Sequence, residues 1–335
     1  MRYPTPLQPG DTIGVTAPSS GVAGPLRPRL DAAVASLRER GFEVVLGDCL
    51  DGSSVTSAPR ARRAAELGAM LTDPAIRAVV PPWGGELAID LLEELDWAAV
   101  ERAEPTWVVG WSDLDTVLLP LTTRLGWATL HGWNLMDTPY AAPDGLLHWV
   151  DVASATGPLT QTSPGRYRAD GWDDYVAEPG VDRMTLSDEG GWSLLGGGEA
   201  SFSGRLVGGC LEVLSPLAGT AYADVRGFGE AHADDGLVVY VEAAEHGAYD
   251  VARALHGLRL AGWFDHATGI LVGRTSAPAA EHLTQAEAVK DALGMLDLPV
   301  VLDVEIGHVQ PFLPLVNGAL ADVDTGDRTL VQTFA

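Results

Sequence analysis

Basic residues, cysteines and long apolar runs are all scarce in this sequence. Only 21 Lys and Arg side chains stand against 46 Asp and Glu, so the formal net charge is −25. A chain this acidic is repelled by nucleic acids and by anionic membrane surfaces, which argues against both as binding partners. No 18 apolar residues follow one another, and the N-terminus lacks the apolar segment of a signal peptide. We therefore expect a cytoplasmic protein without a membrane span.

The cysteines and glycines form none of the familiar cofactor motifs. Cys49 and Cys210 are far apart and belong to no Cys-x-x-Cys pair, which argues against a zinc ribbon, a thiol redox motif or a disulfide scaffold. The sequence has no His-Glu-x-x-His motif and no phosphate-binding loop, and the glycines of segment 204–209 have the wrong spacing for a dinucleotide site. We expect neither a metal nor a cofactor.

Length and pattern indicate about two domains. The chain has 335 residues, of which 46% are hydrophobic, and a domain typically takes about 150 residues. Over residues 1–156 short β-rich runs alternate with helical patterns, which is typical of βαβ units around a parallel sheet. The expected strands are 12–16, 42–46, 76–80 and 106–109, and the expected helices are 30–37, 59–71, 87–95 and 114–125.

The middle of the chain has a different character. From 157 to 198 the periodicity fails, and Pro, Gly, Asp and aromatic residues, among them Trp172, Tyr175 and Trp192, interrupt one another. A connection this long is either functional or disordered, and its aromatic content favours a functional loop. Residues 199–335 then form a second unit, with expected helices at 211–217 and 249–260 and expected strands at 237–241 and 270–272.

Two loops that follow expected strands are candidate site segments, because ligands bind beyond the carboxyl ends of strands in open α/β sheets. One contains Gly84 and Gly85, and the other is Trp111-Ser112-Asp113. A serine on a sharp strand-to-helix turn exposes its Oγ beside backbone N–H groups, which is the geometry that a nucleophile and an oxyanion hole require. The alternative is that Ser112 or Asp113 caps the following helix, and motif strength alone favours the cap.

A serine nucleophile needs a base and a group that orients the base. Among the eight histidines, His308 lies in an irregular segment after an apolar run, where side chains often face a cleft. A hydrogen-bonded loop histidine is the alternative. Glu242 directly follows the apolar strand 237–241, which places one carboxylate at the end of that strand. Glu245, or a solvated acid without a role, is the alternative to Glu242.

A series of short motifs runs along nearly the whole chain. In chain order they are 9–19, Gly84-Gly85, 91–96, Val109-Gly110-Trp111-Ser112-Asp113, 129–132, Gly208-Gly209, Gly219-Thr220, Val241-Glu242 and Gly307-His308. In this order the sequence resembles the LD-carboxypeptidases, a family of serine peptidases that includes microcin C immunity proteins. The resemblance implies that Ser112 is the nucleophile, that His308 is the base, and that Glu242 orients His308.

The resemblance also implies an architecture. An N-terminal Rossmann-like (flavodoxin-like) α/β sandwich, residues 1–156, would donate Ser112. A β-rich α+β C-terminal domain, residues 199–335, would donate Glu242 and His308, so the active site would lie between the two. The expected reaction is hydrolysis of an amide bond through an acyl-enzyme. A homodimer is implied as well.

Two substrate classes are compatible with the resemblance. Microcin immunity enzymes cleave peptidyl- or aminoacyl-nucleotide analogues, and the murein branch removes the terminal D-alanine from a tetrapeptide. The aromatic loop favours the first class, because flat rings stack on a nucleobase, although packing of a long loop onto the surface is the alternative. Departures from the family pattern at Trp111, Trp133 and Cys210 bear on the substrate class. The candidate oxyanion donors are Gly85 and Asp113, and the candidate substrate-binding residues are Gly84, Trp172, Trp192 and Gly209.

Two other classes of function stay open. A glutamine-amidotransferase-like enzyme would share an α/β sandwich, but it needs a cysteine nucleophile on the strand-to-helix turn, and Cys49 and Cys210 are poorly placed for that role. A noncatalytic small-molecule binding protein would keep the pocket without the geometry of a triad. Convergence of Ser112, His308 and Glu242 within hydrogen-bond reach would distinguish an enzyme from a binding protein.

Overall fold

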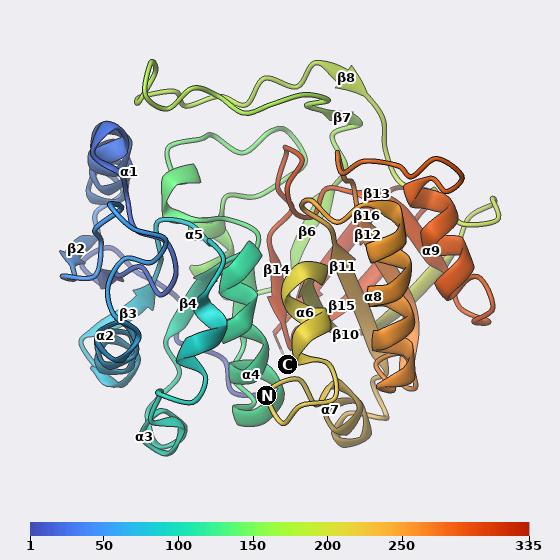
Figure 1. Cartoon of the computed structure of the whole chain (residues 1–335), viewed down its shortest axis with the longest axis horizontal. Coiled ribbons are helices and arrows are strands. Elements are labelled where there is room, and N and C mark those ends of the chain that lie inside the picture. The colour runs from blue at the N-terminus through green and yellow to red at the C-terminus, as the bar shows by residue number, and fades with distance from the viewer. Residues whose placement is uncertain (335) are drawn as a thin grey trace.

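The computed structural model describes residues 1–334 and contains two large β-sheets with helices packed against them. The blue and teal N-terminal elements lie on the left of Figure 1, and the orange and red C-terminal elements lie on the right. This mixed α/β architecture confirms the fold class expected from the sequence.

The first sheet has six strands in the described part of the chain. In hydrogen-bonded order they are β14 (Leu315–Asn317), β5 (Thr129–His131), β4 (Trp107–Gly110), β3 (Ile76–Val79), β1 (Thr12–Val15) and β2 (Glu43–Leu46). Strands β1 to β5 are parallel and follow the order 2-1-3-4-5, which is the flavodoxin-like arrangement. In such sheets ligands bind at the carboxyl ends of the strands, where the strand order reverses between β1 and β3.

Helices connect these strands and bury one face against them. They are η1 (Gly24–Leu26), α1 (Arg27–Glu39), α2 (Arg60–Thr72), η2 (Ala88–Leu91), α3 (Trp97–Arg102), η3 (Ser112–Leu114), α4 (Asp115–Leu125), η4 (Leu135–Asp137) and α5 (Trp149–Ala153). Leu30, Val34 and Leu37 of α1 are buried, as their helical spacing predicts. Helix α4 ends at Gly126, whose φ of 65° is the left-handed conformation that glycine adopts most easily at a helix C-terminus.

One expected helix is not formed. The sequence predicts a helix over 87–95, but the structure has only the short 3₁₀ helix η2 there. The backbone N–H of Ala88 donates to the carboxylate of Asp113 at 2.8 Å, and Asp96 caps the separate helix α3 through the N–H of Ala99. Contacts with the loop that carries Asp113 therefore override the helical periodicity of this segment.

The second sheet has eight strands within residues 1–334. In hydrogen-bonded order they are β6 (Leu159–Thr162), β16 (Thr329–Thr333), β15 (Leu320–Asp324), β10 (Ser201–Cys210), β11 (Leu237–Glu242), β12 (Ala267–Gly273), β13 (Val300–Val304) and β9 (Ser193–Leu194). Strands β10 to β13 are parallel. The helices between them are α6 (Leu211–Leu217), α7 (Val225–Ala231), α8 (Ala248–Leu260) and α9 (Gln285–Leu293).

Strands from distant parts of the sequence link the two halves. β14 follows the segment of His308 in the chain, yet it pairs with β5 of the first sheet, with Leu315 opposite His131. β6 and β9, from the expected loop 157–198, pair with strands of the second sheet. The rest of that loop carries the hairpin of β7 (Arg166–Tyr167) and β8 (Asp188–Glu189) and crosses the top of the molecule in Figure 1. The unit boundaries expected from the sequence stay a prediction.

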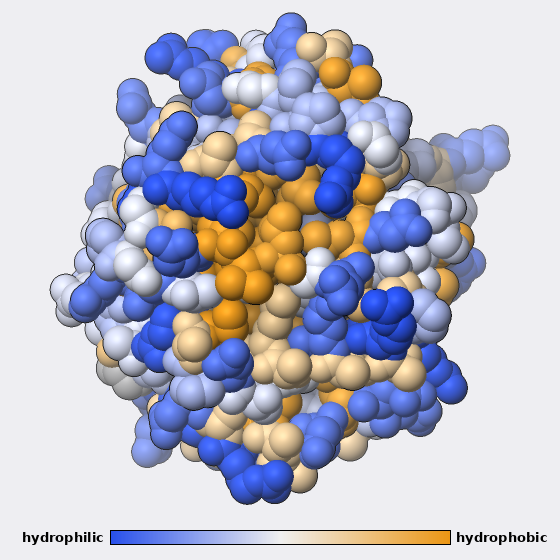
Figure 2. Space-filling model, turned by 90° about the vertical axis from the view of Figure 1, so that its left-hand side faces the viewer, coloured by the Kyte–Doolittle hydropathy of each residue, from blue (hydrophilic) through white to orange (hydrophobic). Residues whose placement is uncertain are grey.

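The side of the molecule that carries β2 has an apolar patch, which faces the viewer in Figure 2. On this strand Val45 and Leu46 are 48% and 41% exposed. Among residues 1–334, no helix has both the length and the apolar character needed to cross a membrane.

Candidate active site

Ser112 lies on a sharp turn between a strand and a helix. Strand β4 ends at Gly110, and the 3₁₀ helix η3 begins at Ser112 and leads into α4. The φ of Ser112 is 65°, a left-handed conformation that residues other than glycine adopt rarely and at an energetic cost. Strained turns of this kind expose a serine Oγ at the edge of a parallel sheet.

His308 and Glu242 converge on Ser112 from the other half of the chain. His308 Nε2 lies 3.1 Å from Ser112 Oγ, and His308 Nδ1 lies 2.8 Å from Glu242 Oε2. Glu242 ends strand β11 and is fully buried. Gly307 has a φ of 92°, and a side chain there would overlap the Glu242 carboxylate. The positions of these atoms fit a nucleophile, a base and a group that orients the base.

The environment of His308 favours its protonated form. Burial acts to lower the pKa of His308, but the charge of Glu242 and the hydrogen bond to Glu242 outweigh burial, and the pKa is raised above its ordinary value. The side chain keeps 21% of its surface exposed, so a substrate can reach the ring. Trp111 packs against the ring with centroids 4.3 Å apart and limits its movement.

The surroundings of Asp113 and Glu245 distinguish the proposed roles of Ser112 and Glu242 from their alternatives. Neither Ser112 nor Asp113 caps the helices that follow the turn, η3 and α4, with its side chain. Instead the Asp113 carboxylate accepts hydrogen bonds from Ser19 Oγ at 2.5 Å and from the N–H of Ala88. Glu245 is exposed, and the carboxylate that meets His308 belongs to Glu242.

Gly84 and Gly85 bring a second loop directly against the serine turn. A Cβ atom on Gly84 would lie 2.9 Å from both Asp113 N and Ser112 Cβ, closer than such atoms pack. Gly85 has a φ of 142°, and a Cβ there would overlap the hydroxyls of Ser19 and Ser20. Only glycine fits at these two positions, which places the loop after β3 beside Ser112 Oγ.

Two cavities open on either side of Ser112 and His308. Ser112, His308, Gly85 and Trp172 line both of them. The cavity toward the first sheet has a volume of about 420 Å³, and we call it the aromatic cavity, because its further lining includes Trp83, Trp111, Met136 and Tyr175. The cavity toward the second sheet has a volume of about 470 Å³, and we call it the acidic cavity, because its further lining includes Glu86, Glu212 and Glu245.

Glu212 carries a negative charge into the acidic cavity. Burial acts to raise the pKa of Glu212, but hydrogen bonds from the backbone N–H groups of Glu245 and His246 outweigh it, and the pKa is lowered. The thiol of Cys210 donates to the other carboxylate oxygen at 3.2 Å. Burial and the neighbouring carboxylates raise the pKa of Cys210 well above its usual range, so this cysteine is a neutral part of the wall and not a nucleophile.

The two tryptophans expected to bind substrate have different environments. Trp172 is 45% exposed, lines both cavities, and lies 6.0 Å from Trp111 and 6.1 Å from Phe312 between ring centroids. Trp192 lines neither cavity. It is 4% exposed in the core of the second sheet, where its indole N–H donates to Glu305 at 2.6 Å. The expectation for Trp192 is therefore corrected, because its burial leaves no face for a substrate.

Gly209 is also absent from the lining of both cavities. Its φ is 149°, and a Cβ there would overlap the carboxylate of Asp115. Gly209 thus permits the close approach of β10 to α4, and its contribution to the site is indirect.

Asp115 and His131 lie behind Glu242, and the sequence analysis gave them no role. His131 Nδ1 lies 2.9 Å from Asp115 Oδ1, and both side chains are fully buried. His131 ends β5, next to β4 in the sheet, so its place at the carboxyl edge beside the serine turn was the signal that could have identified it.

Among residues 1–334, two groups of side chains could in principle hold a metal ion. Within each group, one potential ligand atom per residue lies within 4.8 Å of the others; the groups are Cys210, Glu242 and His308, and Asp115, His131 and Glu242. Hydrogen bonds already join Glu242 to His308 in the first group and Asp115 to His131 in the second, and Cys210 donates to Glu212. We assign no metal to either group.

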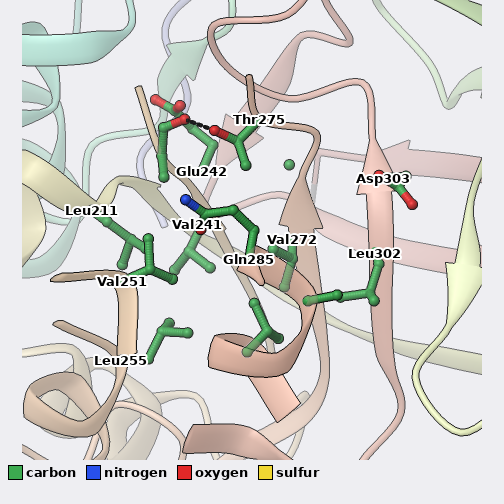
Figure 3. A pocket seen from close by; sticks show the side chains of 14 residues that line it. Leu211, Val241, Glu242, Val251, Leu255, Val272, Thr275, Gln285, Leu302 and Asp303 are labelled. Atoms are coloured by element: carbon green, nitrogen blue, oxygen red, sulfur yellow. Dashed lines mark hydrogen bonds between the residues drawn. The ribbon is translucent and has the colours of Figure 1, made fainter. Parts of the chain in front are cut away.

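A third cavity lies on the far side of Glu242, between β11, β12 and the helices α8 and α9. Figure 3 shows its mainly apolar lining, with Leu211, Val251, Leu255 and Val272 around it. Its volume is about 180 Å³, and neither Ser112 nor His308 lines it. It is therefore separate from the space in which a substrate would meet Ser112.

Comparisons with known proteins find similarity along most of the chain. Family models of the LD-carboxypeptidase N-terminal domain and the LD-carboxypeptidase C-terminal domain match residues 13–132 and 203–323. A protein of Streptomyces coelicolor named as a carboxypeptidase is 32% identical over 98% of this chain and 95% of its own length. A Bacillus subtilis protein named as a murein peptide carboxypeptidase is 27% identical over 98% of this chain and 93% of its own length.

The fold is shared with a solved structure. The Escherichia coli microcin C7 self-immunity protein, solved in complex with aspartyl sulfamoyl adenosine, superposes with a TM-score of 0.81. The superposition covers 99% of this chain and 98% of that chain at 20% sequence identity.

Proposed function

The chain belongs to the LD-carboxypeptidase family of serine peptidases, and from this premise we propose that Ser112, His308 and Glu242 form its catalytic triad. The observation that carries the proposal is the continuous hydrogen-bonded line from Ser112 Oγ through both nitrogens of His308 to Glu242, at 3.1 and 2.8 Å. These distances are within the reach that proton transfer requires. No cysteine occupies the serine turn, which argues against the amidotransferase alternative.

In the proposed reaction the proton moves along this line. His308 Nε2 accepts the proton of Ser112 Oγ as the oxygen attacks the carbonyl carbon of the scissile bond. The same proton passes to the leaving nitrogen, and an acyl-enzyme forms on Ser112. His308 then accepts a proton from water as the water oxygen attacks the acyl carbon, and it returns this proton to Ser112 Oγ as the bond to the acyl group breaks and the acid is released. Glu242 accepts a hydrogen bond from Nδ1–H of His308 and stabilises the positive charge that His308 carries in both transition states.

Backbone N–H groups beside the nucleophile would hold the oxyanion. We assign this role to Asp113, which follows Ser112 in the turn, and to Gly85, which lines both cavities. The loop of Gly84 and Gly85 lies against the serine turn. The backbone N–H groups of Gly85 and Asp113 therefore belong to the same region of the site. One donor of this kind typically lowers the barrier by about 3 kcal/mol.

The two cavities suggest where the two parts of a substrate bind around Ser112. We propose that the aromatic cavity holds a flat group of the substrate. The favoured substrates are aminoacyl- or peptidyl-nucleotide analogues, and murein tetrapeptides are the second candidate class. The exposed ring of Trp172 beside Trp111 supports a stacking contact. A volume of about 420 Å³ falls within the range of small-molecule sites.

Product release from two substrates tests this proposal directly. Purified wild-type protein and the Ser112→Ala variant receive, in parallel, a murein tetrapeptide that ends in D-alanine and an aminoacyl sulfamoyl-adenosine. We expect the wild type to cleave the second substrate faster, and Ser112→Ala to cleave neither. Exclusive cleavage of the tetrapeptide would assign the protein to murein recycling, and full activity in Ser112→Ala would remove Ser112 as the nucleophile.

We also propose that the protein is a cytoplasmic homodimer that contacts its second copy through the face of β2. Both cysteines are free, as is usual in a reducing compartment. The apolar patch in Figure 2 and the exposed Val45 and Leu46 lie at an open sheet edge, which soluble proteins normally cover. Sedimentation of the Val45→Glu/Leu46→Lys variant should show monomers, whereas Leu260→Lys, at an exposed site on α8, should stay dimeric. A wild-type monomer would refute the dimer.

A further inference from the structure

The acidic cavity has negative side chains on its wall and no basic residue to pair with them. Its lining includes Glu86, Glu212 and Glu245 but no Lys or Arg. Among the residues that the structure describes, none of these glutamates forms an ion pair with a basic side chain. Of the described lining residues, only His308 can carry a positive charge. The space beside Ser112 therefore has an excess of negative charge.

Glu212 supplies a fixed negative charge to this cavity. It lies in the first turn of α6, and its Oε1 accepts the backbone N–H groups of Ala244, Glu245 and His246 at 2.8 to 3.0 Å. These donors favour the ionised carboxylate, so its pKa stays below the ordinary value. Its Oε2 accepts the thiol of Cys210 at 3.2 Å. A thiol is a weak donor, and a carboxylate oxygen accepts two hydrogen bonds, so Oε2 can accept a stronger donor from a ligand.

The remaining carboxylates around the two cavities have partners within the protein. Asp113 also lines the acidic cavity, but the hydrogen bonds described above turn its carboxylate into the protein. In the aromatic cavity, Asp173 accepts a hydrogen bond from Arg168 at 2.6 Å. Asp137 accepts the indole N–H of Trp111 at 3.3 Å, and burial raises its pKa. A positively charged group is therefore attracted to the acidic cavity and not to the aromatic cavity.

We propose that the acidic cavity binds the acyl part of the substrate and selects an acyl side chain that carries a positive charge, an ammonium or a guanidinium group. The inference rests on the proposed function, because it assigns the nucleotide leaving group to the aromatic cavity on the other side of Ser112. A cavity of about 470 Å³ falls within the range of small-molecule sites. Glu212 is the specificity-determining residue, and Glu86 and Glu245 add negative charge to the same space.

Glu212 also acts on the proposed base, and the test has to separate the two effects. Its charge contributes to the raised pKa of His308, after the larger contribution of Glu242. An effect through His308 changes the rate with every substrate, whereas an effect on binding of a charged side chain changes the rate with charged substrates alone. The ratio of kcat/KM for two substrates that differ only in side-chain charge therefore isolates the binding effect.

Three aminoacyl sulfamoyl-adenosines provide this comparison in the wild-type protein. Lysyl and norleucyl side chains have the same carbon chain and differ by the terminal ammonium, and the glutamyl side chain has the opposite charge. We expect kcat/KM for the lysyl substrate to exceed that for the norleucyl substrate by roughly 10- to 100-fold, the range of a charge-assisted hydrogen bond. The glutamyl substrate should be cleaved most slowly. Equal values for the lysyl and norleucyl substrates, or a preference for the glutamyl substrate, would overturn the inference.

Matched variants locate the preference in the acidic cavity. Glu212→Gln should lower the lysyl-to-norleucyl ratio by roughly tenfold. Because Glu212 also holds the loop of residues 244–246, Glu245→Lys is the second variant; its exposed side chain makes an effect of about fivefold reasonable. Glu39→Lys, at the exposed end of α1 and outside the lining of both cavities, should leave the ratio unchanged. A ratio that stays at the wild-type value in both cavity variants would refute the assignment.

Binding to the Ser112→Ala variant distinguishes failure of this inference from failure of the proposed function. Calorimetric titration with the same three analogues gives Kd without turnover, and the lysyl analogue should bind roughly 10- to 100-fold more tightly than the norleucyl analogue. The difference should shrink in 1 M salt, which screens charges. Equal Kd values would overturn the inference even if the wild type cleaves both substrates. If Ser112→Ala still cleaves them, the proposed triad fails, and the ratio of kcat/KM still tests the acidic cavity.

Discussion

The two halves of the molecule contribute to the site by different physical means. The first sheet contributes backbone geometry: a strained φ at Ser112 and two glycines that allow a second loop to touch the serine turn. The second sheet contributes charge: a buried carboxylate at Glu242 and the imidazole of His308. The comparison teaches that the proposed nucleophile depends on backbone shape, whereas the proposed proton transfer depends on electrostatics and hence on pH.

Replacement of the proposed nucleophile should have the largest effect. Ser112→Ala removes the attacking oxygen, so kcat should fall by roughly five to six orders of magnitude. Alanine keeps the backbone turn, so the melting temperature should stay within about 2 °C of the wild type. Burst kinetics with the cleaved substrate and thermal denaturation measure the two quantities, and an intact burst in the variant would contradict the shape-based role of the first sheet.

Neutralisation of the buried carboxylate should have the next largest effect. Glu242→Gln keeps the size of the side chain but removes its charge, and loss of the orienting carboxylate in such triads costs about 10⁴-fold in kcat. Because Glu242 raises the pKa of His308, and because His308 acts as a base only when neutral, the acidic limb of kcat/KM should move to lower pH in this variant. If the acidic limb of kcat/KM stays at the wild-type pH, Glu242 does not raise the pKa of His308.

A single added methyl group tests the geometric contribution of the first sheet. Gly84→Ala places a Cβ 2.9 Å from Asp113 N and Ser112 Cβ, so the turn must shift, and a displacement of about 1 Å can cost about 10²-fold in rate. The pH profile should keep its shape, because no charge changes. Gly24→Ala is the control, since a Cβ there meets no atom within 4 Å. Equal rates in the two variants would argue against a strict geometric requirement.

The aromatic cavity should give the narrowest effect, on the binding of one substrate class. Trp172→Ala should raise KM for a nucleotide-bearing substrate by roughly 5- to 150-fold, because stacking on one base is worth about 1–3 kcal/mol, and it should leave KM for a murein tetrapeptide nearly unchanged. Trp192→Ala should instead lower stability, since the ring is buried in the core. Equal KM shifts for both substrates would remove the stacking role of Trp172.

Much of the first half was predictable from the sequence, because strands and helices that alternate along the chain pair with near neighbours. The pairing of β14 with β5 was not, since Leu315 and His131 are far apart in sequence and nothing local specifies their register. The short helix η2 replaced an expected longer helix because Ala88 donates to Asp113, a contact that periodicity does not encode.

Residues of the candidate site were predictable from the sequence where they follow a strand. They were not predictable where tertiary contacts determine their positions. Ser112 follows strand β4 by two residues and Glu242 ends strand β11, and the order of motifs made His308 a candidate. Asp115 looks in sequence like an ordinary first-turn acid of a helix, so its contact with His131 could not be foreseen. Trp192 was assigned to substrate on aromatic content, which does not reveal whether a ring faces a cavity or the core.

The pairing of β14 with β5 also governs when the molecule can mature during synthesis. Strand β5 is made early, but its partner lies at residues 315–317, so the nascent first half leaves the ribosome with an open sheet edge. Such edges attract other chains, and partly folded chains aggregate through them. The late strand covers the edge of β5 and follows His308 by only a few residues, so β5 gains its second neighbour and His308 reaches Ser112 in the same final stage of folding.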